Sequence, residues 1–178
     1  MNPIKSFLFI LARACTMTSC FDNTGYQSSP YMEFGYAYVN PQFVGDTTFI
    51  GGEDTLFSHY NEALEQWCLD TLHLGDTMMF PAYFTSFTNN LVSVVASFDT
   101  TRVNLWFDLK SNDQLVINSI AAGSQVEKGI LIFSPMYNEA TFPIYVVPQE
   151  AGTYPIKITV TSDSQFPNNA SLFTLPVK

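Results

Sequence analysis

Two histidines and one cysteine are the side chains of this sequence best suited to covalent chemistry. His59, Cys68 and His73 lie close together in the sequence, and hydrolytic dyads and triads need a histidine beside a nucleophile. Cys68 lies between Trp67 and Leu69, however, and apolar surroundings make a thiol unreactive. We therefore expect Cys68 to be a core residue and the protein not to be an enzyme. A hydrolase stays open as an alternative if a cleft brings a histidine within about 3 Å of Cys68, a serine or a carboxylate.

Acidic residues are the other candidate ligands, because residues 20–100 hold ten Asp and Glu and no Lys or Arg. Calcium binds several oxygen ligands, which the Gly-Gly-Glu-Asp segment 51–54, or Asp70 with Asp76, could supply. No segment follows the Asp-x-Asp-x-Asp-Gly pattern of a calcium loop, and no Cys-x-x-Cys or His-x-x-x-His spacing predicts zinc. We interpret the acidic half as a solvated surface and expect no metal ion and no cofactor.

Five Asp-Thr pairs are spread along the chain, each followed by Thr, Leu or Met. Asp is common in turns and Thr in strands, so the pairs can mark junctions between a turn and a strand. The same pattern resembles the acceptor motif of general O-glycosylation in Bacteroidota, and this resemblance implies a glycan on the threonine. The sequence leaves both interpretations open. The five candidate threonines are Thr47, Thr55, Thr71, Thr77 and Thr100.

Trp106 is the candidate for binding a ligand without catalysis. It shares parity with Asn104 and Asp108, so in a strand with one buried face its ring would face solvent. A flat exposed ring can stack on a sugar, although a loop or a second sheet can also cover it. Glycan binding through Trp106 is therefore a hypothesis, which requires that the ring be accessible.

Strands must position these residues, because alternation with a period of two recurs along the chain. Ten Pro, nine Gly and 15% aromatic residues favour short strands joined by turns over long helices. Segment 58–69 fits either a hairpin that turns at Asn61-Glu62 or one short helical turn. The side chains expected to face inward are Met32, Phe34, Tyr36 and Tyr38; Val92, Val94, Ala96 and Phe98; Val103, Leu105, Phe107 and Leu109; and Ile156, Ile158 and Val160.

A five-residue motif, Glu150-Ala151-Gly152-Thr153-Tyr154, directly precedes the clearest alternating segment. It resembles the acidic-x-Gly-x-Tyr corner of immunoglobulin-like domains, in which the tyrosine hydroxyl bonds to the backbone a few residues upstream. The resemblance implies an all-β protein, an immunoglobulin-like antiparallel β-sandwich whose last strand runs from Ser171 to Val177. We do not expect the disulfide of antibody domains, because Cys68 is the one cysteine in residues 31–178.

The first twenty residues have the pattern of a targeting segment: Lys5, an apolar run over 7–12, and then small and polar residues up to Cys20. The apolar run is too short to cross a bilayer as a helix. Residues 17–20 (Met-Thr-Ser-Cys) resemble the lipobox of bacterial lipoproteins, which implies cleavage after residue 19 and a lipid on Cys20. We therefore expect a signal peptide over 1–19, the lipidated Cys20 with a tether over 20–30, and one β-sandwich domain over 31–178.

The charge of the chain restricts its partners. The net charge is −9, and it becomes 5 − 16 = −11 without residues 1–19, so no partner bound through phosphates is expected, nucleic acid included. As a whole, residues 20–178 resemble the small surface lipoproteins of Bacteroidota, which implies an outer-membrane lipoprotein that is periplasmic or surface-exposed. We expect a non-catalytic cell-envelope module that binds a glycan or a protein, with a role accessory to glycan capture. A fimbrial or scaffold subunit is a further alternative.

Overall fold

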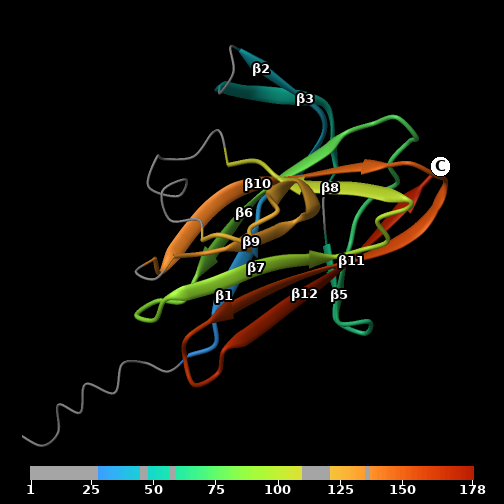
Figure 1. Ribbon diagram of the computed structural model, residues 1–178. Coiled ribbons are helices and arrows are strands. Elements are labelled where there is room, and N and C mark those ends of the chain that lie inside the picture. The colour runs from blue at the N-terminus through green and yellow to red at the C-terminus, as the bar shows by residue number, and fades with distance from the viewer. Residues whose placement is uncertain (1–27, 45–47, 57–58, 110–120, 135–136) are drawn as a thin grey trace, which may run out of the picture.

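Two six-stranded β-sheets form the computed structural model of this protein, which describes residues 28–44, 48–56, 59–109, 121–134 and 137–178 (Figure 1). The first sheet contains β1 (Tyr31–Phe34), β2 (Ala37–Val44), β3 (Thr48–Leu56), β6 (Met78–Thr85), β8 (Val103–Phe107) and β10 (Glu139–Pro148). The second sheet contains β4 (His59–Asn61), β5 (Gln66–Cys68), β7 (Leu91–Ser97), β9 (Ile130–Ile132), β11 (Gly152–Ser162) and β12 (Asn168–Val177).

The strand order is β3-β2-β6-β10-β8 in the first sheet, with β1 also paired to β6, and β4-β5-β12-β11-β7-β9 in the second. In the described part of the chain the strand pairs are antiparallel, apart from the short parallel pair of β5 with β12. The expected fold class is therefore confirmed: the protein is an all-β sandwich. Among the same residues, no helix is long and apolar enough to cross a membrane.

The core lies between the two sheets and is built from alternate residues of each strand, as their sequence patterns predict. Val103, Leu105 and Phe107 of β8 are buried, and so are the alternating apolar residues of β11, Ile156, Ile158 and Val160. Aromatic rings connect the layers: Phe34 of the first sheet meets Phe173 of the second edge to face, with ring centroids 4.7 Å apart. Burial of these side chains supplies the main favourable free energy of folding.

The expectation that Tyr36 and Tyr38 point inward is wrong. Tyr36 is 61% exposed and Tyr38 is half-buried. The chain kinks at Gly35, between β1 and β2, so that Ala37 and Val39 face inward instead. The Gly35 amide donates a hydrogen bond to the carbonyl oxygen of Pro81 at 2.8 Å. A Cβ atom at position 35 would lie 2.6 Å from the Pro81 ring, so this close approach requires glycine.

Val92 is also exposed rather than buried, and a β-bulge explains the difference. Ser93 pairs with Thr161 and Leu91 with Ser162, so Val92 has no partner on β11 where the register shifts. The extra residue changes the parity of β7, and Leu91 therefore takes the buried position beside Val94. A bulge of this kind depends on the neighbouring strand and leaves no mark in the alternation of β7 itself.

Within described residues 59–69, segment 58–69 forms a hairpin, one of its two expected structures, but the turn covers residues 62–65 instead of Asn61-Glu62, because Asn61 still pairs with Gln66. β4 and β5 are antiparallel, and the side-chain oxygen of Asn61 accepts hydrogen bonds from the amides of Ala63 and Leu64 in the turn. Cys68 is half-buried, so the expectation of a core cysteine is wrong. The reason is its position: β5 is a three-residue strand beside the edge strand β4, where the sandwich covers a side chain only in part.

Candidate binding site

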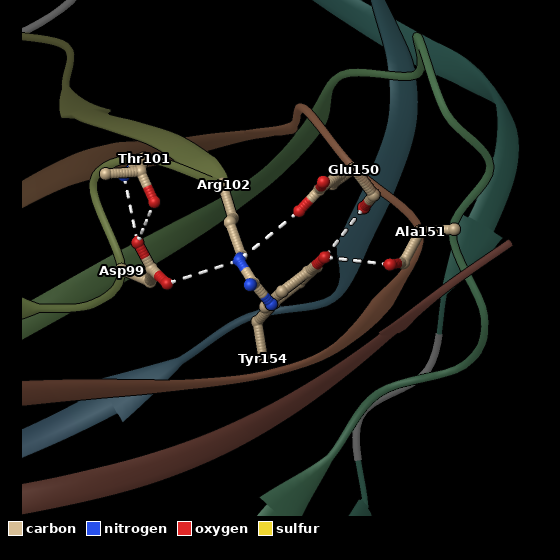
Figure 2. A network of polar contacts seen from close by, with 6 residues as sticks. All are labelled: Asp99, Thr101, Arg102, Glu150, Ala151 and Tyr154. Carbon is tan, nitrogen blue, oxygen red and sulfur yellow. Dashed lines mark hydrogen bonds and ion pairs between the residues drawn. The ribbon is translucent and has the colours of Figure 1, made fainter.

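The tyrosine corner predicted from residues 150–154 is present at one end of the sandwich. The Tyr154 hydroxyl donates to the carbonyl oxygens of Glu150 and Ala151, both at 3.0 Å (Figure 2). Because Tyr154 is buried while the two carbonyls belong to the turn between β10 and β11, the phenol fixes the point where the chain passes from the first sheet to the second. β12 follows β11 and extends three residues further upstream than the expected strand 171–177.

A second crossing between the sheets, the turn from β7 to β8, is held against this corner. The backbone amide of Gln149 donates a hydrogen bond to the carbonyl oxygen of Arg102 at 2.7 Å. The Arg102 Nε atom lies 3.3 Å from Glu150 Oε2 and 3.6 Å from Asp99 Oδ2 (Figure 2). The hydroxyl and amide of Thr101 donate to Asp99, and these bonds hold the pKa of that carboxyl below its usual value. Two turns that are far apart in the sequence thus form one polar network.

Next to this network, Trp106 borders a groove with a volume of about 620 Å³. Trp106 lies on the outer face of β8, as its parity predicts, and stacks on Tyr145 of the adjacent β10 with ring centroids 5.1 Å apart and planes inclined by 5°. The Trp106 side chain is half-buried rather than fully solvated. The groove is lined by Phe98, Thr100, Val103, Asn104, Leu105, Trp106, Glu127 and Lys128.

Three segments bring the groove residues together. Phe98 and Thr100 come from the turn between β7 and β8, and Glu127 and Lys128 from the 3₁₀ turn η1 (Val126–Lys128). Gly129 ends η1 in the left-handed conformation, with φ 68°. A Cβ atom there would lie 2.8 Å from side-chain atoms of both Ala96 and Leu105, so glycine allows η1 to approach β8. Leu105 is consequently only 1% exposed, although β8 is the last strand of its sheet.

The groove combines an aromatic ring with groups that form hydrogen bonds. Asn104 and Thr100 offer both donors and acceptors, Glu127 offers acceptors and Lys128 offers donors. Burial raises the pKa of the Tyr145 hydroxyl above its usual value, and the Asp108 carboxylate raises it further, so the phenol under Trp106 stays neutral. Such a surface can hold a polar ligand that has flat apolar faces, and the volume lies within the usual range for ligand sites.

Of the four candidate threonines that the structure describes, only Thr100 lines the groove, and it is exposed. Thr71 and Thr77 are half-buried, and Thr77 donates its backbone amide to the Asn40 side chain at 3.0 Å. Thr55 lies in β3, so the expected junction with a turn does not hold there. Thr47 lies outside the described residues, as do Cys20 and the expected signal peptide 1–19.

His59 and Cys68 lie in the β4–β5 hairpin, and His73 lies in the segment that follows it. His59 and Cys68 are direct neighbours across the β4–β5 ladder, a pairing that their spacing alone did not predict. The His73 side chain is 77% exposed, with Nδ1 3.6 Å from Asp76 Oδ2. Asp76 also accepts a hydrogen bond from Asn40 at 3.0 Å. No group of three or more His, Cys, Asp or Glu side chains suited to a metal ion occurs among the described residues.

The sequence pattern singled out Trp106 but not Phe98, Glu127 and Lys128, which line the same groove. Glu127 and Lys128 belong to a short turn with no buried residue, and nothing in their local sequence connects them with β8. The one available signal was Gly129, a glycine between a charged turn and an apolar strand, which is typical of a left-handed residue after a helical turn.

No protein-family model matches the sequence, and no curated protein shows significant sequence similarity to it. Among experimentally solved structures, the cupredoxin domain of amoB from Nitrosocaldus yellowstonii superimposes with a TM-score of 0.34 and 11% identity, over 57% of this chain and 56% of that one. The PapD-like domain 7 of human CEP192 gives a TM-score of 0.33 and 10% identity, over 62% of this chain and 79% of that one. The chain thus spans little more than half of the cupredoxin domain, and its similarity to both structures is a distant likeness between β-sandwiches.

Proposed function

We propose that this protein is a non-catalytic binding module of a bacterial cell envelope, held at the outer membrane by a lipid on Cys20, and that it captures a glycan in the groove beside Trp106. The observation that carries the binding role is the stacked pair of Trp106 and Tyr145 at the border of a 620 Å³ groove with Asn104, Glu127 and Lys128 in its lining. The lipid anchor rests on the lipobox-like residues 17–20.

A sugar suits the groove because it has both an apolar and a polar surface. The axial C–H groups of a pyranose form a flat apolar face that packs on an indole ring, and its hydroxyls need both donors and acceptors. The groove offers Trp106 for the first, and Thr100, Asn104, Glu127 and Lys128 for the second. Tyr145 supports the indole from behind and fixes its plane, which lowers the entropy that binding would cost.

Two features of the described residues support the non-catalytic role: the exposure of His73 and the lining of the groove. His73 is solvent-exposed, and the partner it approaches is Asp76 rather than a serine or a cysteine. Among the described residues that line the groove, Glu127 is the one carboxylate, whereas glycoside hydrolysis generally uses a pair of carboxyl groups across the scissile bond. The groove is therefore better equipped to hold a glycan than to cleave one.

An oligosaccharide array probed with the purified lipidated protein tests the binding role. We expect retention on at least one class of glycan, lost in Trp106→Ala and kept in Leu64→Ala, a matched change of an exposed apolar side chain on the β4–β5 turn. Equal retention by the two variants would show that Trp106 does not bind the glycan. The anchor is tested separately, since labelled palmitate should enter the wild-type protein and not the Cys20→Ala variant.

A further inference from the structure

The end of the sandwich opposite the tyrosine corner is built from four segments that hydrogen bonds join together. The turn between β6 and β7 meets the turn between β11 and β12, where Asn90 donates two hydrogen bonds of 2.7 Å to Asp163. The same β6–β7 turn meets the start of β10, where the Asn138 side chain donates to the Phe87 carbonyl at 2.7 Å. These contacts make the end a defined surface rather than a set of separate loops.

The described chain also begins at this end. The Asn169 side chain donates to the Pro30 carbonyl at 2.9 Å, which ties the segment before β1 to the first residues of β12. Tyr31 then pairs with Thr85, the last residue of β6. Figure 1 shows the chain entering beside the turns between β6 and β7 and between β11 and β12, with the C-terminus at the far end.

Three large aromatic side chains are exposed on the segments of this end, and we call this end of the sandwich the aromatic end. Tyr31 is 45% exposed, Phe87 48% and Phe166 55%. Phe87 has a positive φ of 58°, a conformation that costs free energy for a bulky side chain and holds its ring at the tip of the turn. Exposed aromatic side chains at one end of a domain are typical of a surface that meets a partner or a membrane.

The charges at the aromatic end disfavour partners that are bound through anionic groups. The described segments of this end, 28–31, 85–91, 137–140 and 162–169, contain no Lys or Arg. Their acidic residues are Glu139, which accepts a hydrogen bond from the Tyr83 hydroxyl at 3.2 Å, and Asp163, which accepts from Asn90. These described segments therefore offer no cation to anionic lipid or nucleic acid, and a lipid contact made through them would be apolar and made with zwitterionic headgroups.

We propose that the aromatic end docks on the lipid surface to which Cys20 is anchored. The inference rests on the proposed function, because only a lipid on Cys20 brings the bilayer to this end. Seven residues, 21–27, separate Cys20 from Ser28, and the eight Cα steps between them span at most about 28 Å. Aromatic side chains are favoured at the membrane–water interface, where rings reach the boundary of headgroups and acyl chains. The short tether and the exposed rings therefore both favour the bilayer as the partner of this end.

Docking in this way orients the binding groove away from the bilayer. β7 runs from the aromatic end toward the tyrosine corner, and the turn that follows it contributes Phe98 and Thr100 to the groove. Trp106 would then lie at a fixed distance from the bilayer and be open to the solvent, whereas an undocked domain would rotate freely on its tether. A long or polysaccharide ligand could reach it without competing with lipid headgroups.

The test measures which rings contact acyl chains in the full lipidated protein. The Phe166→Trp and Tyr31→Trp variants are reconstituted into phosphatidylcholine–phosphatidylethanolamine vesicles whose acyl chains are either brominated or unbrominated. The matched control is Leu74→Trp, because Leu74 is similarly exposed but lies near Lys178 at the other end. The unsubstituted protein gives the contribution of the native tryptophans. Bromine should quench the emission of the two aromatic-end variants, in low and high salt alike, and leave Leu74→Trp unchanged.

Each other outcome contradicts the proposal in a distinguishable way. Equal quenching of Phe166→Trp and Leu74→Trp, with intact mass showing the lipid on Cys20, overturns the docking and leaves the anchor standing. An intact mass without lipid overturns the anchor and the docking together. A blue-shifted Phe166→Trp emission that bromine does not quench would mean that the ring packs on another copy of the protein instead of on lipid.

Discussion

Asn90 and Asp163 lie 73 positions apart and form two hydrogen bonds of 2.7 Å, one from the Asn90 backbone amide and one from its side chain. The pair ties together the turns at the aromatic end. These two bonds hold the pKa of the Asp163 carboxyl below its usual value, because both stabilise the ionised form. The relationship makes the stability of this end depend on pH.

The Asp163→Asn variant should lose stability at neutral pH by less than about 1 kcal/mol, since solvent screens an exposed charge. A carboxyl with a lowered pKa in the folded state stabilises the protein above its unfolded pKa of about 3.8, and this contribution is lost as the pH falls through the folded value. The difference in melting temperature between wild type and variant should therefore be constant above about pH 5 and shrink below pH 4. A gap that widens on acidification would contradict the assignment.

Tyr154→Phe should destabilise the protein by about 1 kcal/mol, because the variant keeps the buried ring and loses both hydrogen bonds to the turn. Urea unfolding followed by tryptophan fluorescence measures the change. Tyr31→Phe, which alters an exposed tyrosine at the other end, serves as the control and should change stability by no more than about 0.5 kcal/mol. An equally small effect at both positions would mean that the corner does not stabilise the sheet crossing.

Gly129→Ala should cost roughly 3 kcal/mol, which combines backbone strain at φ 68° with overlap against Ala96 and Leu105. Gly75→Ala separates the two effects, because Gly75 has φ 91° but no atom within 4 Å of the added carbon, and strain alone costs about 1 kcal/mol. Equal losses in the two variants would show that η1 yields to the added methyl group. Because η1 carries Glu127 and Lys128, Gly129→Ala should also weaken glycan retention.

The sequence predicted the parts of the fold that depend on local pattern. Ile156, Ile158 and Val160 alternate cleanly because β11 is central in its sheet and buries one face along its length. The tyrosine corner was equally readable, since a short motif specifies it. Tyr36 and Val92 were misplaced because a kink at a glycine and a bulge against a neighbouring strand each change the parity, and both depend on contacts made only after the sheets form.

The candidate site was predictable only in its most conspicuous residue. Trp106 stood out by parity, but its support by Tyr145 depends on the register of β8 against β10. Glu127 and Lys128 reach the groove because η1 packs on β8, a tertiary contact that no periodicity describes. The register of His59 with Cys68 was likewise not fixed by their spacing, because a hairpin turn of a different length would change which residues face each other.

Fluorescence of the Trp67→Phe variant tests the glycan site most directly, because Trp106 is then the remaining tryptophan of the sequence. The variant is titrated with a panel of neutral and acidic oligosaccharides, and Trp106→Phe is titrated in parallel as the control. We expect a saturable change in Trp106 emission with at least one glycan class and no change in the emission of the control. Emission that stays constant across the whole panel would contradict the proposal that Trp106 binds a glycan.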